Sequence, residues 1–185
     1  MTDDLQPRIL IVDDEPEILE VVSEQLCDLE IEIDGFRIKP LLETADNGIT
    51  ALKKIKAIRY DVVISDIRMP ALDGLEIVEQ LNQTEPTTKV ILISGHADKN
   101  IAIRALRLGV FDLIEKPWQR DMLCESVKKA SILAYKRRLS EIDFEKKMAR
   151  YAAAMPPDRY EQLRNAMRSI MLNQVDSDKK PTDEG

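Results

Sequence analysis

Residues 9–14 read Ile-Leu-Ile-Val-Asp-Asp, four apolar residues followed directly by two acids. A short run of this kind is typical of a strand that is buried on both faces of a sheet. Similar runs lie at residues 62–66, 90–93 and 111–115, and stretches of helical periodicity separate them. This alternation predicts repeated βα units around a parallel sheet.

The full pattern predicts five strands, near residues 8–12, 41–44, 62–65, 90–93 and 111–115. The predicted fold class is α/β, a five-stranded, parallel, doubly wound sheet of the flavodoxin-like order 2-1-3-4-5, with a C-terminal helical extension. A length of 185 residues with 44% apolar content suits one compact domain and an appendage.

Residues 29–40 interrupt the pattern, because apolar and polar residues alternate there on both sides of Asp34 and Gly35. One interpretation is a tight hairpin inserted before the second strand. The other is a longer first helix and a longer second strand, joined by an ordinary loop.

No strand pattern follows Trp118. One helix is predicted from about Arg120 to Ala154 and a second at residues 158–172, with Pro156 and Pro157 between them. We therefore expect a main domain at residues 1–130, a helical extension at 131–173 and a disordered tail at 174–185. Apolar residues recur in the first helix at three- and four-residue steps, which predicts a homodimer through this helix, at Ile132, Tyr135, Leu139, Ile142 and Ala149.

Charge and composition limit the function further. A net charge of −7 argues against DNA binding, although residues 136–150 carry a local surplus of basic side chains. Neither a membrane-spanning run nor a signal sequence is present, so we expect a cytoplasmic protein. Cys27 and Cys124 lack metal-ligand spacing and are expected to be thiols.

Charged side chains follow the predicted strands at their carboxyl ends. Asp13 and Asp14 follow the first strand, Asp66 the third and Lys116 the fifth. Because parallel strands place these ends at one edge of the sheet, three carboxylates and one ammonium group are expected to converge there. Repulsion between the acids favours a bound divalent cation, and carboxylate oxygens suit Mg²⁺.

Each of these residues also has a structural interpretation when it is taken alone. Asp14 caps the first helix, with Glu17 three positions later completing a capping box. Asp66 closes a strand, Ser94 satisfies a backbone amide, and Lys116 is a solvated surface charge. Their joint occurrence at four strand ends favours a functional site.

Together, these motifs resemble the receiver domain of bacterial two-component response regulators, of the nitrogen-regulatory branch, over about residues 7–130. The resemblance rests on five short motifs: Ile-Val-Asp-Asp-Glu-Pro at 11–16, Asp-Ile-Arg-Met-Pro at 66–70 with Asp-Gly at 73–74, Ser-Gly-His-Ala at 94–97, Leu-Gly at 108–109 and Glu-Lys-Pro-Trp at 115–118.

The resemblance implies Asp66 as phosphoacceptor, with a phosphoryl group supplied by a histidine kinase or phosphotransfer protein in an Mg²⁺-dependent reaction. It implies metal ligation by Asp13, Asp14, Asp66 and the backbone carbonyl of Arg68. Lys116 and Ser94 are the implied phosphate-binding residues, and Ser94 also matches the family's switch hydroxyl. The bond between Lys116 and Pro117 is a candidate for the cis form. Output is expected through contacts with a protein target.

Two positions bear on regulation. Leu113 stands where the family commonly has Tyr or Phe, so any switch there uses packing of Leu113 in place of rotation of an aromatic ring. His96 lies two residues after Ser94, and it is either a residue that tunes dephosphorylation or a plain surface histidine.

Three other functions compete with this one. These hypotheses are a phosphorelay intermediate, a pseudo-receiver scaffold that is not phosphorylated, and a phosphatase resembling the haloacid dehalogenases. The phosphatases carry Asp-x-Asp after the first strand, whereas Asp13 is followed directly by Asp14. A nucleotide hydrolase of the P-loop class is excluded because no GxxxxGK[ST] loop occurs.

Overall fold

The computed structural model describes residues 6–33, 35–95, 99–152 and 156–177. The chain divides into two compact units, Met1–Tyr135 and Lys136–Gly185. The division falls inside the long helix that follows the last strand, and each unit is described in turn.

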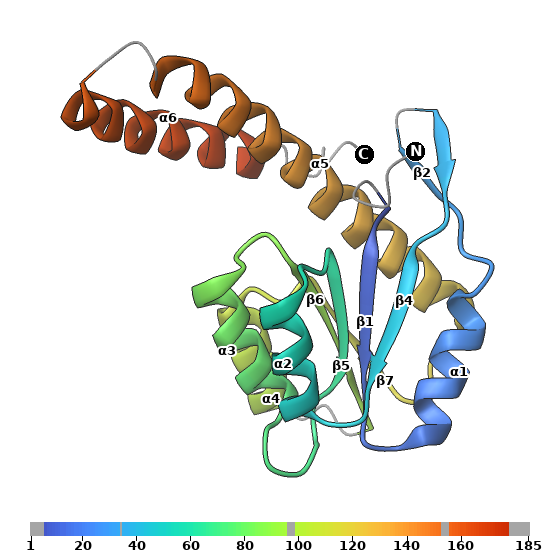
Figure 1. The fold of residues 1–185 in the computed structure, drawn as a ribbon. Coiled ribbons are helices and arrows are strands. Elements are labelled where there is room, and N and C mark those ends of the chain that lie inside the picture. The colour runs from blue at the N-terminus through green and yellow to red at the C-terminus, as the bar shows by residue number, and fades with distance from the viewer. Residues whose placement is uncertain (1–5, 34, 96–98, 153–155, 178–185) are drawn as a thin grey trace, which may run out of the picture. The chain divides into compact units, whose positions relative to one another are not determined.

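Five parallel strands form the sheet of the first unit (Figure 1). The strands are β1 (Arg8–Val12), β4 (Leu41–Ala45), β5 (Val62–Asp66), β6 (Lys89–Ser94) and β7 (Asp112–Glu115). Their spatial order is β4-β1-β5-β6-β7, and every neighbouring pair is parallel. β2 and β3 belong to a separate hairpin, so β4 is the second strand of this sheet along the chain and β5, β6 and β7 are the third to fifth. The observed order is therefore the predicted 2-1-3-4-5. The predicted fold class is therefore confirmed.

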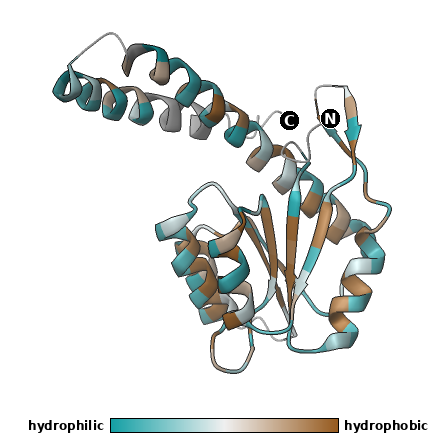
Figure 2. Cartoon of the chain, viewed as in Figure 1, coloured by the Kyte–Doolittle hydropathy of each residue, from teal (hydrophilic) through white to brown (hydrophobic). Residues whose placement is uncertain are grey.

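Helices cover both faces of this sheet. Their bounds are α1 (Pro16–Leu26), α2 (Gly48–Ala57), α3 (Gly74–Thr84), α4 (Lys99–Leu108) and α5 (Arg120–Ala152). In Figure 1, α2, α3 and α4 lie on one side of the sheet, and α1 and the first turns of α5 lie on the other. The strands are hydrophobic along most of their length (Figure 2), as expected for strands that are covered on both faces.

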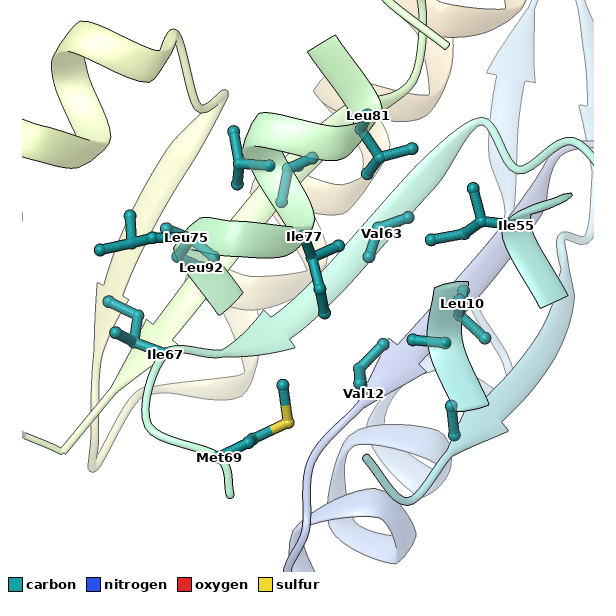
Figure 3. Close-up of a cluster of buried hydrophobic side chains, with 14 of the residues drawn as sticks. Leu10, Val12, Ile55, Val63, Ile67, Met69, Leu75, Ile77, Leu81 and Leu92 are labelled. Atoms are coloured by element: carbon teal, nitrogen blue, oxygen red, sulfur yellow. The ribbon is translucent and has the colours of Figure 1, made fainter. Parts of the chain in front are cut away.

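One hydrophobic core lies between the sheet and α2, α3 and α4 (Figure 3). Leu10, Val63 and Leu92 supply it from three neighbouring strands, and Ile55 and Ile77 from two helices. These side chains are almost fully buried, and each contributes about 1.5 to 3 kcal/mol by leaving water. The register of β1, β5 and β6 brings their carboxyl ends to the same edge of the sheet.

Local side-chain contacts determine where α3 begins. The Asp73 carboxylate accepts a hydrogen bond from the Glu76 backbone N–H at 2.7 Å, and the Glu76 carboxylate accepts one from the Asp73 N–H at 2.8 Å. This reciprocal pair satisfies two backbone donors at the start of the helix. Helix α3 therefore begins directly after the loop that carries Arg68.

The insertion forms the hairpin of the first interpretation. β2 (Ile31–Ile33) and β3 (Phe36–Ile38) pair antiparallel, and Gly35 adopts a positive φ of 83° in the turn. Ile31 and Ile33 are buried, whereas Phe36 is exposed. Hairpin residues share a hollow of about 350 Å³ with α5, lined by Glu30, Glu32, Arg37, Lys128 and Ile132. The hairpin therefore lies against the first half of α5.

The second unit pairs the distal part of α5 with α6 (Pro157–Ser177), which runs back along it (Figure 1). Glu145 and Arg164 join the two helices through an ion pair of 3.0 Å. Phe144 and Met148 are buried apolar residues of α5 in this unit. Of the seam predicted to form a homodimer, Ile142 is 39% exposed and Ala149 is also exposed in this unit.

The end of α6 also differs from the prediction, which stopped the helix at Leu172. Residues 173–177 belong to α6 because neither proline nor glycine interrupts them, whereas residues 178–185 lie outside the described part of the chain. Within the described residues, no helix is long and apolar enough to cross a membrane. Cys27 and Cys124 are free thiols, as expected.

Candidate functional site

The carboxyl edge of the sheet brings an amine between two acids. The Lys116 Nζ atom lies 2.7 Å from Asp66 Oδ1 and 3.0 Å from Asp13 Oδ2. Asp13 directly follows β1, Asp66 ends β5 and Lys116 follows β7. Three residues that are widely separated in the sequence therefore form one hydrogen-bonded group.

The strand register explains why these side chains meet. Val12 pairs with Ser65 across β1 and β5, so the next residues, Asp13 and Asp66, leave the sheet at the same level. On the other side, the Lys116 backbone N–H donates to the Ser94 carbonyl at 2.8 Å. This bond extends the β6–β7 ladder by one residue and holds the Lys116 main chain at the site. The peptide bond between Lys116 and Pro117 is cis, as predicted.

Backbone amides bind the remaining oxygens of the two acids. Asp13 Oδ1 accepts from the Glu15 N–H at 2.9 Å, and Asp66 Oδ2 accepts from the Arg68 N–H at 2.5 Å. Asp13 is 2% exposed and Asp66 is 7% exposed. Each carboxylate thus has one oxygen bound to an amide and the other to Lys116, which compensates its burial.

Burial and charge shift the pKa values in this group. Burial raises the pKa of Asp13 above its ordinary value, although the Glu15 amide and the Lys116 ammonium oppose the rise. Burial alone lowers the pKa of Lys116, but its hydrogen bonds and its attraction to Asp66 and Asp13 outweigh burial and raise that pKa. Lys116 is therefore a cation at neutral pH.

Asp14 differs from the other two acids in its exposure. It is exposed, and it lines a hollow of about 580 Å³ with side chains of the β5–α3 loop and of α4, among them Arg68, Asp73 and Arg104. The capping interpretation of Asp14 is wrong, because Glu15 is the N-cap residue of α1 and no side-chain cap is formed there. Asp14 is thus at the surface beside the buried pair.

Of the three carboxylates expected at this edge, Asp13 and Asp66 share Lys116, whereas Asp14 is exposed. Across the described residues, no three acidic, histidine or cysteine side chains are arranged to hold a metal ion. Two buried carboxylates repel each other, and the Lys116 ammonium between them relieves that repulsion. By their chemistry, Asp13, Asp14 and Asp66 fit Mg²⁺, which binds hard oxygen ligands and commonly uses one or two carboxylates.

The structure also places the predicted switch residues. Ser94 ends β6, is 1% exposed and pairs with Glu115 of β7. Leu113 is half-buried and packs against the core described above. His96 lies outside the described residues.

Sequence reasoning missed two neighbours of this group. Glu15 Oε1 lies 3.7 Å from Lys116 Nζ, so a third acid stands at the exposed rim of the site. Its position directly after Asp13 and Asp14 was the available signal. Gly74 packs so closely that a Cβ atom there would lie 2.3 Å from the Asp66 carbonyl oxygen. No feature of the sequence alone reveals that approach.

Comparison with known families explains this arrangement. A family model described as the response regulator receiver domain matches residues 9–128. The chain belongs to this family. The receiver domain of the chain therefore includes Asp13, Asp66, Ser94 and Lys116.

Several curated relatives resemble the receiver domain. The C4-dicarboxylate transport transcriptional regulatory protein DctD of Pseudomonas aeruginosa is 34% identical over 127 residues, which are 69% of this chain and 26% of DctD. The chemotaxis protein CheY of Listeria monocytogenes is 32% identical over 67% of this chain and 98% of CheY. The chain thus spans about a quarter of DctD and almost all of CheY.

Solved structures share the same fold. A CheY-like response regulator receiver domain protein from Methanospirillum hungatei has a TM-score of 0.62 and 27% identity, and covers 71% of this chain and 98% of its own. A response regulator receiver domain protein from Clostridium thermocellum has a TM-score of 0.59 and 32% identity, over 70% and 97% of the two chains. The helical extension lies beyond the residues that the family model matches.

Proposed function

We propose that Asp66 accepts a phosphoryl group from a histidine kinase or phosphotransfer protein, and that the modified receiver domain signals through protein contacts in the cytoplasm. The observation that carries this proposal is the 2.7 Å contact between Asp66 and Lys116 beside the buried Asp13. An acid with an amine at this distance has both the nucleophile and the countercharge that phosphoryl transfer requires.

The chemistry follows from the positions of these groups. An Asp66 carboxylate oxygen attacks phosphorus, and the bond from phosphorus to the donor's nitrogen or oxygen breaks, leaving its electron pair on the donor. Lys116 turns from the carboxylates to the phosphoryl oxygens and offsets their charge, and the Ser94 hydroxyl donates to them. Asp13, Asp14, Asp66 and the Arg68 carbonyl would hold Mg²⁺. When bound, this ion neutralises charge on the transferring group.

A relay role is the second candidate function. The single histidine of the chain is His96, so the two helices of the extension contain no histidine that receives the phosphoryl group. In a relay, Asp66 would therefore pass the phosphoryl group to a separate protein. The extension then serves recognition and takes no part in the chemistry.

Labelling with a small phosphodonor tests the phosphoacceptor. The full chain is incubated with acetyl phosphate and Mg²⁺, and covalent phosphate is measured by intact mass. We expect labelling of the wild type and none of Asp66→Asn, because an amide is not a nucleophile for this reaction. Asp46→Asn is the matched control: Asp46 also follows a parallel strand, but it is exposed and bonded only to Asn47 among the described residues. An Asp66→Asn sample that still takes up phosphate refutes the assignment.

We also propose that the chain forms a homodimer through the helical extension. Ile142 leaves a β-branched apolar side chain at the surface of α5, beside the half-buried Leu139. Sedimentation equilibrium is expected to give a dimer mass for the wild type and a monomer mass for Ile142→Asp. The control is Ile103→Asp, at a similarly exposed isoleucine of α4 in the first unit. A wild-type monomer mass at every concentration contradicts the dimer.

A further inference from the structure

A charged hydrogen bond joins the last strand of the sheet to α5. The Ser126 hydroxyl of α5 donates to Asp112 Oδ2 at 2.6 Å, and Asp112 Oδ1 accepts from the Leu113 backbone N–H at 2.8 Å. Ser126 is 6% exposed. Hydrogen bonds to a carboxylate are shorter and stronger than neutral ones, and the partial burial of this one limits competition from water.

The strand side of this bond connects directly to the candidate site. β7 runs from Asp112 to Glu115, and the next residue is Lys116. β7 pairs with β6 from Ile91 to Ser94, and the Ser94 carbonyl accepts the Lys116 N–H. Because all four residues of β7 pair with β6, a displacement of the main chain at Ser94 and Lys116 would displace β7 with it.

The helix side has a fixed point at the beginning of α5, about two turns before Ser126. The indole Nε1 of Trp118 donates to Gln25 Oε1 at 2.8 Å, and the Arg120 Nε donates to the Gln25 carbonyl at 3.2 Å. These bonds tie the beginning of α5 to α1, which is covalently remote from β7. A displacement of Ser126 is therefore expected to rotate α5 about its anchored N-terminal end.

We propose that the Asp112–Ser126 hydrogen bond couples phosphorylation of Asp66 to a movement of α5, the helix that continues into the extension. The inference rests on the proposed function, in which Lys116 and Ser94 move to the phosphoryl group. Asp112 moves with β7, and its hydrogen bond to the Ser126 hydroxyl transmits this movement to α5. Ser126 is thus a positioning residue for output and takes no part in the transfer itself.

Hydrogen–deuterium exchange on the full chain tests this coupling, with acetyl phosphate and Mg²⁺ as the probe. Intact mass reports labelling, peptides from β6 and β7 report the local change, and peptides from residues 120–135 report α5. In the wild type we expect phosphorylation to change exchange in both regions. In Ser126→Ala, labelling and the β6–β7 change persist, but the α5 change is lost.

Two further variants distinguish the effect of losing the Asp112–Ser126 hydrogen bond from a general change in the stability of α5. Ser126→Thr keeps a hydroxyl and is expected to restore the α5 response. Ser140→Ala is the matched control, because its hydroxyl donates to the Lys136 carbonyl within α5 itself, and it is expected to behave as wild type. A labelled Ser126→Ala with the full α5 response, or a labelled wild type without one, overturns the coupling alone. An unlabelled wild type overturns the proposed function and the coupling with it.

Discussion

Replacing Lys116 with methionine is expected to lower the free energy of unfolding by about 3 kcal/mol at neutral pH, because the variant leaves two buried carboxylates without their cation. Methionine keeps most of the apolar side chain, so packing changes little. Lys116 is 17% exposed at its side chain, and Asp13 and Asp66 are less exposed still, so solvent screens the loss only weakly. Urea denaturation monitored by circular dichroism measures the change.

The pH dependence of this loss has a definite sign. The pKa of Asp13 is already raised by burial, and removing Lys116 raises it further. A carboxyl with a raised pKa in the folded state favours folding below its ordinary pKa, and this contribution is lost as the pH rises through the folded-state pKa. The deficit of the variant is therefore full at neutral pH and shrinks on acidification.

At alkaline pH the free energies of unfolding of the wild type and Lys116→Met converge for another reason. Lys116 has a pKa raised above 10.5, so its stabilising contribution is present below that pH and disappears as the pH rises through the raised value. Lys129→Met is the control, since Lys129 forms an exposed pair with Glu125 on α5 and should leave stability unchanged. A Lys116→Met protein as stable as wild type at pH 7 contradicts the assigned charge balance.

Gly74→Ala is expected to destabilise the receiver domain by about 3 kcal/mol, the upper range for inserting atoms into a packed site. An added Cβ atom would lie 2.3 Å from the Asp66 carbonyl oxygen and 3.1 Å from the Ile67 Cα atom. Both are backbone atoms, so no flexible side chain moves aside. The Gly74 N–H also donates to the Ile67 carbonyl at 3.0 Å, which holds the two segments together.

The same substitution is expected to slow phosphate labelling, because relief of the contact displaces the main chain of Asp66. Thermal unfolding and the acetyl phosphate assay measure the two effects on one sample. Gly95→Ala is the matched control: a Cβ atom there meets no atom of the described residues within 4 Å, and its stability is expected to stay near that of wild type. Equal melting temperatures for both variants contradict the packing argument.

The sequence was sufficient to predict the five strands and the charged residues at their ends, in a fold whose usual strand order proved correct. Residues 9–12 and 62–65 are apolar throughout, and such runs are local patterns that predict buried strands without knowledge of their neighbours. Because parallel strands end at one edge, the positions of Asp13, Asp66 and Lys116 followed from the order. The Asp-Gly turn likewise predicted the hairpin as one of two interpretations.

Contacts between distant residues were decided by the tertiary structure alone. Lys116 bridges Asp13 and Asp66, whereas Asp14 lines an open hollow, although Asp13 and Asp14 both follow β1. The bond from Ser126 to Asp112 and the approach of Gly74 to Asp66 have no sequence pattern. Strand formation depends on residues that are close in sequence, but distances of a few ångströms across the site depend on how the sheet and helices pack. The sequence therefore determined which acids and which lysine follow the strands at this edge, and packing determined which of them touch.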